Sequence, residues 1–222
     1  MKVKISVLIL ILFCVILNAQ SLYNTKLYGF NGIVKTVTSY EYENQDLKKE
    51  NYKSKTMLYF NTSGELTKSI RDIKSSDRIY TFKSTFISAK NKVFQLRYDY
   101  DSKLSDSITY EKINKNLYSI HGKEIETNIK TIGKQFIDDF GRDLSSNYEY
   151  YDGSKIIEKY SYRNILENNL VTKYINNFDG KLVTENLKYY EFDENKNPTK
   201  ILFFELDDKS TKKIIIREFT YY

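Results

Sequence analysis

Apolar and polar side chains alternate along most of the chain after its first twenty residues. In residues 34–43, β-branched and aromatic side chains take every second position, as in Thr36, Thr38, Tyr40 and Tyr42. A period of two with these residue types is typical of a half-buried β-strand. The same pattern predicts further strands at residues 56–60, 79–82, 93–98, 107–110, 148–151, 156–162, 187–192, 201–206 and 214–222.

Short turn-forming clusters separate these segments. They include Asp152-Gly153-Ser154 and Asp179-Gly180, and Asp-Gly between apolar runs is a strong hairpin signal. Short strands joined by regular turns predict an antiparallel meander. We therefore expect an all-β fold, an antiparallel meander of hairpin repeats that forms a curved open sheet. A β-sandwich and an up-and-down barrel are the alternatives.

Two segments fit a strand pattern less well, because their apolar residues lie at helical spacing. In the first, residues 125–136, the Ile and Thr content and Gly133 favour a strand. The second contains Leu166, Leu170 and Tyr174. Its pattern fits a short helix as well as a strand, and the sequence leaves both open.

One nine-residue pattern recurs. FNTSGELTK at residues 60–68 and FDENKNPTK at residues 192–200 align without a gap. The shared rule is an aromatic residue, Asn or Asp, two variable residues, a Gly-like residue, any residue, then Leu. A copy starts at Phe192, and four leading aromatics recur at a spacing of 38 residues: Phe60, Tyr98, Phe136 and Tyr174.

This pattern has a structural interpretation. The aromatic residue ends a strand, the Asn or Asp side chain caps the turn, and the Gly-like residue takes a left-handed backbone conformation. The Leu then begins the return strand. A period of 38 residues, about two hairpins long, suggests stacked supersecondary units.

The pattern resembles the Tyr-Asp repeat of the RHS/YD-repeat proteins, whose core reads Tyr-Asp-x-x-Gly-Arg/Asn-Leu. It is also similar to the degenerate repeats of small bacterial secreted proteins of unknown function, whose usual opening resembles residues 27–42. The resemblance is carried by Phe60-Asn61…Gly64-Glu65-Leu66, Tyr98-Asp99…Leu104 and Phe192-Asp193…Asn197. Long RHS proteins build β shells that enclose a toxin. With about five copies and no added C-terminal domain, we expect no closed shell here.

The first residues predict export. Lys2 and Lys4 precede an apolar run from Ile5 to Leu17, and small and polar residues follow it. This order is typical of a secretory signal peptide, and the run is shorter than the roughly 20 residues of a membrane span. We expect a signal peptide over residues 1–19, cleaved near Ala19, and a single β-rich repeat domain over residues 20–222. The mature protein is then secreted or periplasmic.

Composition narrows the chemistry. The single cysteine, Cys14, lies inside the apolar run after Phe13, which argues against lipoprotein processing. Its removal leaves no thiol for a disulfide, a metal site or catalysis. The net charge of +6 is scattered, so we expect no nucleic-acid partner. The 21 Tyr and 13 Phe favour β structure.

Few residues suggest an active site. His121 is the single histidine, and we expect it in or beside an exposed turn, where it has no partner for a zinc site. The acidic clusters lie where the meander needs turns, so solvated turn acids are the preferred interpretation. These clusters are Asp138-Asp139 with Asp143, Asp193-Glu194 and Asp207-Asp208. We therefore predict no catalytic, cofactor-binding or metal-binding residues and no cofactor.

The tyrosines suggest one binding surface. Tyr148, Tyr150 and Tyr151, or Tyr160 and Tyr162, would stack on sugar rings if they formed an exposed stripe on the sheet. Packing across neighbouring strands is the simpler explanation.

An outer-membrane barrel needs a continuous apolar outer face, and Lys and Glu interrupt nearly every strand here. We expect no membrane span after removal of the signal. The preferred function is a non-enzymatic module that binds an unknown protein through its sheet face. The alternative is a carbohydrate-binding or hydrolytic envelope protein that uses carboxylates on turns. An enzyme would bring together two or more of Asp138, Asp139, Asp143, Glu191, Asp193 and His121.

Overall fold

The computed structural model describes residues 22–43, 46–76, 78–205 and 211–222, and the side chains of Glu205 and Thr211 are not described. The predicted signal peptide over residues 1–19, its cleavage near Ala19 and Cys14 lie outside these ranges. So do Asp207 and Asp208.

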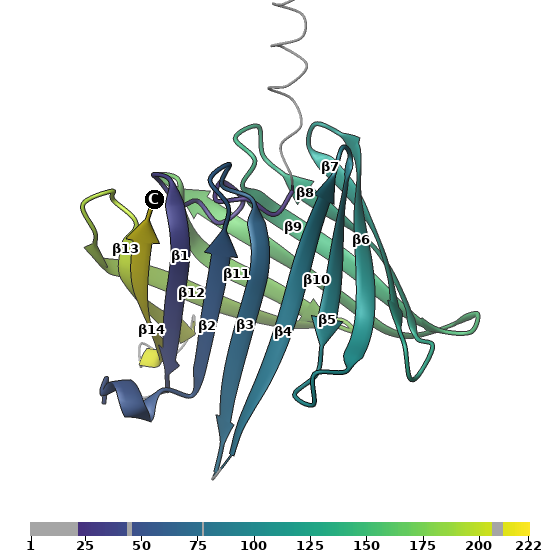
Figure 1. Cartoon of the computed structure of the whole chain (residues 1–222), viewed down its shortest axis with the longest axis horizontal. Helices are drawn as coiled ribbons and strands as arrows, with labels where there is room; N and C mark the ends of the chain where they lie inside the picture. Colours follow the sequence, from purple (N-terminus) through teal and green to yellow (C-terminus); the bar gives the residue numbers. More distant parts are fainter. Residues whose placement is uncertain (1–21, 44–45, 77, 206–210) are drawn as a thin grey trace, which may run out of the picture.

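The described residues form a closed antiparallel barrel in which each strand pairs with the next along the chain (Figure 1). One 3-10 helix, η1 (Lys49–Asn51), lies between the first two strands. The strands are β1 (Val34–Tyr42), β2 (Ser54–Phe60), β3 (Leu66–Ser75), β4 (Arg78–Ala89), β5 (Lys92–Tyr98), β6 (Leu104–Asn114), β7 (Leu117–Glu124), β8 (Lys130–Ile137), β9 (Asp143–Asp152), β10 (Lys155–Glu167), β11 (Leu170–Phe178), β12 (Lys181–Phe192), β13 (Pro198–Glu205) and β14 (Thr211–Tyr221). Within the described ranges, no helix has the length and hydropathy of a membrane span.

The first and last strands close the barrel. β1 pairs with β14 in a register that places Val34 opposite Tyr221 and Tyr42 opposite Ile214. The all-β antiparallel meander is confirmed, and it closes as an up-and-down barrel. The expected curved open sheet is wrong, because its two edge strands satisfy each other's backbone hydrogen bonds.

The alternation of apolar and polar residues predicted most of the strands but not all of them. β3 and β7 were not predicted, and the two ambiguous segments are strands. Residues 125–136 contain the turn before β8 and most of β8, and residues 166–174 contain the hairpin turn between β10 and β11. Asn168 and Asn169 take the left-handed conformation in that turn (φ 49° and 68°). Two asparagines that tolerate positive φ are typical of a tight hairpin, which excludes the helix.

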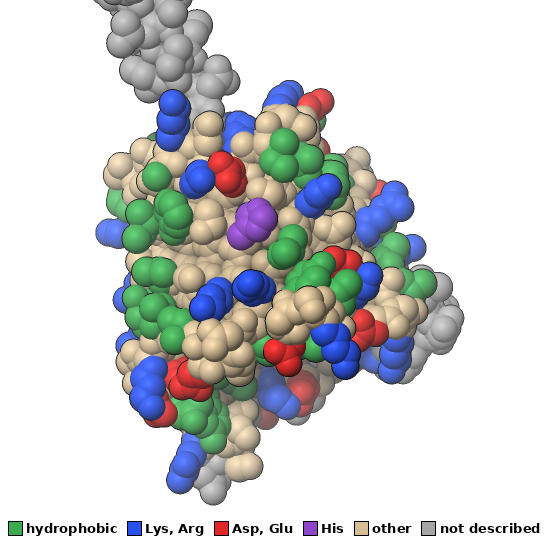
Figure 2. Space-filling model, turned by 90° about the vertical axis from the view of Figure 1, so that its right-hand side faces the viewer, with side chains coloured by type: hydrophobic (Ala, Val, Ile, Leu, Met, Phe, Trp, Pro, Cys, Tyr) green, Lys and Arg blue, Asp and Glu red, His purple; other side chains and the backbone are tan. Residues whose placement is uncertain are grey.

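Side chains alternate between the interior and the outer wall. On β7, Tyr118 and Ile120 are buried inside, whereas His121 and Lys123 are exposed outside. On β8, Gln135 and Ile137 point inward. Basic side chains lie across the outer wall around the single histidine (purple in Figure 2). Exposed basic residues on the strands include Lys123, Lys130, Lys134, Lys159 and Arg163.

The repeated pattern builds one kind of turn at four places. In the β2–β3 turn, the Asn61 amide donates to the Glu65 carbonyl oxygen at 2.9 Å, and the Gly64 amide donates to the Asn61 carbonyl oxygen at 2.9 Å. The same two bonds recur in three further turns: β5–β6 (Asp99, Ser102, Lys103), β8–β9 (Asp138, Gly141, Arg142) and β12–β13 (Asp193, Lys196, Asn197). In each turn the Asn or Asp Oδ1 accepts the backbone N–H four residues later.

The Gly-like position has positive φ in all four turns, at Gly64, Ser102, Gly141 and Lys196. The predicted turn geometry is therefore confirmed, but two of the leading aromatics were misplaced. The third copy begins at Ile137, one residue after Phe136, and Tyr174 lies inside β11. The relation to RHS/YD-repeat proteins stays a prediction.

A segment before β1, Leu22–Asn31, crosses one end of the barrel, and we call it the crossing segment (purple in Figure 1). Three of the repeated turns hold it. The Thr25 amide donates to the Gly64 carbonyl oxygen at 2.9 Å, and the Asn31 amide donates to Asn197 Oδ1 at 2.7 Å. The Asp143 amide, just after the β8–β9 turn, donates to the Leu27 carbonyl oxygen at 3.4 Å. Because these turns lie at separate places around the rim, the segment spans the opening.

The main hydrophobic core forms where the crossing segment meets the barrel interior. Leu22, Leu27 and Phe30 pack there against inward side chains of β1 to β8. Those side chains are Val34, Val37, Phe60, Leu66, Phe86, Val93, Ile108, Tyr110, Tyr118, Ile120 and Ile137. The crossing segment thus fills the interior on the β1–β8 side.

Candidate functional site

The interior on the β9–β14 side is only partly filled, by a smaller apolar cluster of Leu187, Ile201 and Phe203. A cavity of about 430 Å³ lies there, bounded by the crossing segment at Leu27–Phe30. Its polar lining comes from inward positions of successive strands and from two turns: Arg142, Asp143, Tyr160, Tyr162, Asn164, Asn169, Tyr174, Asn176, Glu185, Tyr189 and Arg217. A concave site of this size, with an apolar lining and a few convergent polar groups, is typical of small-molecule binding.

Arg217 is the main positive charge without a partner in this cavity. It lies on β14 opposite Ser39, at an inward position that alternates with the outward Ile216 and Glu218. Its Nε is buried and has no hydrogen-bond partner among the described residues, and no described carboxylate forms an ion pair with it. The guanidinium carbon lies 5.5 Å from the centre of the Phe30 ring.

Burial lowers the pKa of Arg217 from its ordinary value, because an apolar surrounding disfavours the charged form. An arginine stays protonated even so, because its ordinary pKa lies far above neutral pH. The site therefore holds a half-buried cation whose Nε has no partner among the described residues, and solvent and protein groups only partly balance its charge.

Tyrosines shape the wall beside Arg217. The Tyr189 hydroxyl donates to the Val171 carbonyl oxygen at 2.7 Å, and the Tyr160 hydroxyl donates to Asn176 Oδ1 at 3.1 Å. The Tyr174 ring stacks on Phe203 with a centroid distance of 6.1 Å. These contacts hold flat ring surfaces in place around the cavity.

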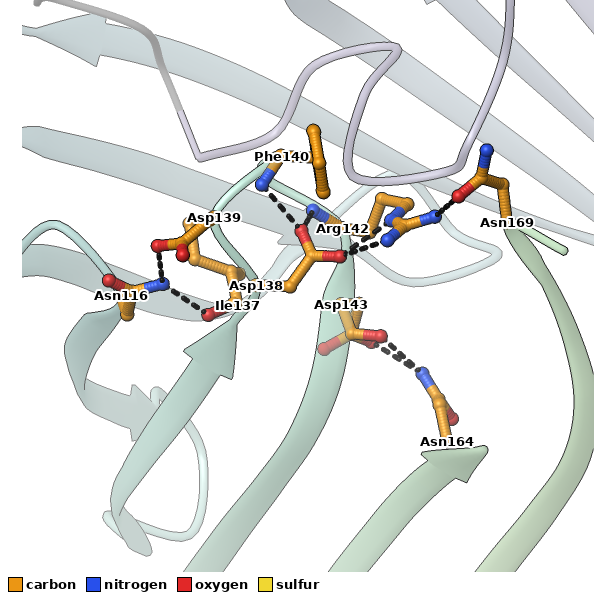
Figure 3. Close-up of polar contacts among 9 residues, drawn as sticks. All are labelled: Asn116, Ile137, Asp138, Asp139, Phe140, Arg142, Asp143, Asn164 and Asn169. Atoms are coloured by element: carbon orange, nitrogen blue, oxygen red, sulfur yellow. Dashed lines mark hydrogen bonds and ion pairs between the residues drawn. The ribbon is translucent and has the colours of Figure 1, made fainter. Parts of the chain in front are cut away.

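Among the described residues of the predicted acidic clusters, Asp143 is the carboxylate that lines the cavity. It accepts hydrogen bonds from Tyr162 Oη at 2.6 Å and from Gln135 Nε2 at 3.1 Å. Asn164 Nδ2 donates to the Asp143 carbonyl oxygen at 3.0 Å (Figure 3). Burial raises the pKa of the Asp143 carboxyl, and these hydrogen bonds oppose the rise. The expectation of a solvated turn acid is wrong for Asp143, because β9 begins at this residue and turns it inward.

The other acids of this cluster hold the rim together. Asp138 accepts hydrogen bonds from Arg142 Nε at 2.6 Å and from the Arg142 backbone amide at 2.9 Å. Arg142 also donates to Asn169 Oδ1 at 2.6 Å, which links the β8–β9 turn to the β10–β11 turn (Figure 3). Asp139 is exposed and pairs with Lys115 at 2.9 Å. The pKa of Asp139 is lowered by the hydrogen bonds from Lys115 and Asn116.

The remaining candidates lie apart from the cavity. Asp193 caps the β12–β13 turn and accepts a hydrogen bond from the Tyr221 hydroxyl, and Glu191 pairs with Lys200 at 3.2 Å. His121 is exposed, as expected, but lies within β7 opposite Thr109 and Ile132, not in a turn. Within the described ranges, no group of three or more His, Cys, Asp or Glu is placed to hold a metal ion.

The predicted tyrosine stripe is mostly inside the barrel. Tyr160 is paired with Tyr148 across β9 and β10, and their rings stack at a centroid distance of 6.0 Å. Tyr162 bonds Asp143, whereas Tyr151 lies on the opposite face and bonds Glu149. Cross-strand packing, the simpler explanation, is confirmed, and an exposed sugar platform is wrong.

Arg217 is not among the site candidates predicted from the sequence, which are a histidine, carboxylates and tyrosines. A signal was present. In residues 213–221 the positions Ile215, Phe219 and Tyr221 predict one face of a strand, and Arg217 is a charged residue on that face. A charge on a face that the pattern expects to be apolar is a candidate site residue.

No family model matches this chain, and no curated protein matches it. Solved structures that resemble this chain include two porin-like proteins. A porin-like protein from Bacteroides vulgatus ATCC 8482 is 11% identical with a TM-score of 0.49, over 86% of this chain and 99% of that chain. A porin-like protein from Bacteroides uniformis ATCC 8492 is 9% identical with a TM-score of 0.44, over 84% of this chain and 98% of that chain. With TM-scores below 0.5, neither likeness carries a functional argument.

Proposed function

We propose that this protein is an exported, non-enzymatic β-barrel that binds a small molecule in its interior. The observation that carries the proposal is the cavity of about 430 Å³ between the crossing segment and the β9–β14 side. Its wall combines fixed tyrosine rings with a few buried polar groups, the composition expected of a ligand site. The site lies inside the barrel, whereas the sequence favoured a protein partner on the sheet face.

A binding role is preferred over hydrolysis because the carboxylates are engaged separately. Asp138 is paired with Arg142, Asp193 caps a turn, and Asp143 is surrounded by hydrogen-bond donors. A glycosidase needs two carboxyl groups that face one bond across the substrate. The pattern seen supports scaffold roles for Asp138 and Asp193.

The outer wall supports an aqueous location in the cell envelope or outside the cell. Exposed Lys134, Lys159 and Arg163 lie within strands, at positions that a membrane barrel fills with apolar residues. A basic residue at the middle of a bilayer costs about 2–4 kcal/mol. Export itself rests on the predicted signal peptide, which lies outside the described residues.

Binding of a fluorescent dye tests the cavity directly. The chain has no tryptophan, so the protein itself contributes little fluorescence beyond that of tyrosine. We expect the neutral dye N-phenyl-1-naphthylamine to bind with a rise in emission. Val171→Trp places a large ring at the cavity wall and should weaken dye binding by about tenfold or more, because the volume is then filled. The matched control is Ile175→Trp, on the outer face of the same strand.

The proposal is contradicted if the wild-type protein does not bind the dye, or if Val171→Trp and Ile175→Trp bind it as tightly as the wild type does. Circular dichroism and thermal unfolding establish that each variant is folded. A dye affinity that falls equally in both variants would indicate surface binding and would also overturn the proposal.

A further inference from the structure

The position of Arg217 bears on what the cavity binds. Two other arginines that approach the interior have carboxylate partners: Arg97 Nε lies 2.5 Å from Asp106 Oδ1, and Arg142 is paired with Asp138. Arg217 has no such partner among the described residues, and its Nε is buried. An uncompensated buried charge is costly, so proteins keep one mainly where something else supplies the opposite charge.

The acids in the same cavity do not supply that charge. Glu185 lies 3.7 Å from Lys213, an ion pair within the barrel. Asp143 is satisfied by donors from Tyr162, Gln135 and Asn164. The neighbours that influence Arg217 electrostatically are the hydroxyls of Tyr174 and Tyr189, which are neutral at physiological pH. The cavity therefore presents a positive group toward open volume.

A second polar side chain in the cavity, Asn164, also lacks a hydrogen-bond partner for one of its atoms within the described part of the chain. Asn164 Nδ2 donates to the Asp143 carbonyl oxygen and carboxylate, which fixes the orientation of the amide. Asn164 Oδ1 is then a buried acceptor without a partner among the described residues. A buried acceptor of this kind is completed by a water or by a donor on a ligand.

Apolar and aromatic side chains supply much of the remaining lining. Leu166, Leu170, Val171 and the rings of Tyr160 and Tyr174 belong to the same wall as these two polar positions, and Arg142, Asn169 and Asn176 complete it. Flat rings fixed by hydrogen bonds and stacking favour a flat apolar body over a flexible chain.

Building on the proposed cavity function, we propose that the ligand is a small organic anion with a flat apolar body. The carboxylate or sulfonate of the ligand accepts hydrogen bonds from the Arg217 guanidinium. The body lies against the tyrosine-lined wall, and a hydroxyl or amino donor on it completes Asn164 Oδ1. A guanidinium suits this role because its planar N–H groups match a carboxylate and keep their charge at all physiological pH values.

Two dyes that differ by one charged group test the proposal. The anionic probe is 8-anilino-1-naphthalenesulfonate, and the neutral probe is N-phenyl-1-naphthylamine, the same body without the sulfonate. We expect the wild-type protein to bind the anionic probe more tightly. Arg217→Met should weaken the anionic probe by about 10- to 100-fold, the value of a lost charged hydrogen bond, and leave the neutral probe within about twofold.

Matched variants and competitors locate the effect. Arg163→Met removes an exposed arginine from the outer face of β10 and should leave both probe affinities unchanged. Arg217→Lys keeps the charge and should retain part of the preference for the anion. Benzoate should displace the anionic probe, and benzyl alcohol at the same concentration should not.

The outcomes separate the two proposals. If neither probe binds, the proposed cavity function fails. If both bind with equal affinity and Arg217→Met changes neither, the cavity function stands and the anion inference is wrong. If Arg163→Met weakens the anionic probe as much as Arg217→Met does, the preference comes from the general surface charge, and the anion inference is again overturned.

Discussion

Two inward-facing arginines show how differently the two sides of the barrel interior are built. Arg97 lies on β5, one of the strands that contribute to the main core, and its half-exposed side chain bonds Asp106 at 2.5 Å. Arg217 on β14 lies on the cavity side and has a buried Nε with no partner among the described residues. Both positions face the same lumen, yet one charge is balanced by the protein and the other is not.

The two sides of the interior differ in what their side chains contribute: packing on the β1–β8 side stabilises the fold, and the cavity side, in the proposed function, binds a ligand. On the filled side, side chains such as Ile120 and Val37 have no exposed surface and belong to one large apolar cluster. On the cavity side, Tyr162, Asn164 and Arg217 keep polar atoms and open volume together. Proteins often accept a local loss of stability where a ligand binds, and this half of the barrel has that composition.

The largest expected effect is the loss of packing on the filled side. Ile120→Ala should lower the free energy of unfolding by about 3 kcal/mol, because Ile120 has no exposed surface and its removal leaves a cavity. Leu166→Ala, at the wall of the existing cavity, should cost only about 1 kcal/mol, because its side chain is partly exposed to open volume. Urea denaturation of both variants measures the difference. Equal losses would show that the two sides are packed alike.

The next effect is that the two Arg→Met substitutions should change the free energy of unfolding in opposite directions. Arg97→Met should destabilise the protein by about 2 kcal/mol because it leaves Asp106 buried and unpaired, a cost reduced by the half-exposed position of Arg97. Arg217→Met should stabilise the ligand-free protein by about 1 kcal/mol, because it removes a half-buried charge that has no counter-ion among the described residues.

Thermal unfolding of both variants, without added anion, checks this pair. A loss of stability in Arg217→Met similar to that in Arg97→Met would mean that Arg217 is balanced within the protein. The comparison of the two sides would then fail.

The smallest expected effect is a pH dependence from Asp143. Its folded-state pKa is raised by burial, so the folded protein holds this proton more tightly than the unfolded chain does. The contribution of Asp143 to stability should therefore fall as pH rises from the ordinary carboxyl pKa of about 4 through the raised value. Asp143→Asn should remove this fall.

Asp139 is the control for that experiment. Its pKa is lowered by Lys115, so its contribution is present above the ordinary pKa and is lost as pH falls. Asp139→Asn should change the pH dependence in the opposite direction. Unfolding curves from about pH 2 to neutrality measure both, because the Asp139 contribution is lost below its ordinary pKa and the Asp143 contribution above it. A change of the same sign in the two variants would contradict the assignment.

The sequence predicted the local structure of this protein better than its closure. Alternation from Thr36 to Tyr42 and the turn signal at Asn61–Gly64 depend on neighbouring residues, and both were confirmed. The pairing of Val34 with Tyr221 depends on the twist accumulated over all the strands between them. No local pattern encodes that sum, so the sequence suggested an open sheet.

The cavity was not predictable for a similar reason. The sequence predicts Asp143 as a turn acid because Asp138 and Asp139 precede it closely. In the structure, Asp143 is the first residue of β9, and its side chain faces the interior. Arg217 lies within an alternating segment, but its lack of a partner among the described residues depends on the β8–β9 turn, β9 and β12, where the carboxylates contact other groups. Such absences become visible when the strands are assembled.

The crossing segment also has a consequence for the order of folding. Asn31 and Asn197, which bond each other, are 166 residues apart in the chain. The entropy of closing so long a loop is lost before the contact forms, and contacts between distant residues slow folding. The segment nearest the beginning of the barrel therefore reaches its final position only after the β12–β13 hairpin exists. Until that moment the apolar side chains of Leu27 and Phe30 stay exposed, so the interval before docking is when the chain is most prone to aggregate.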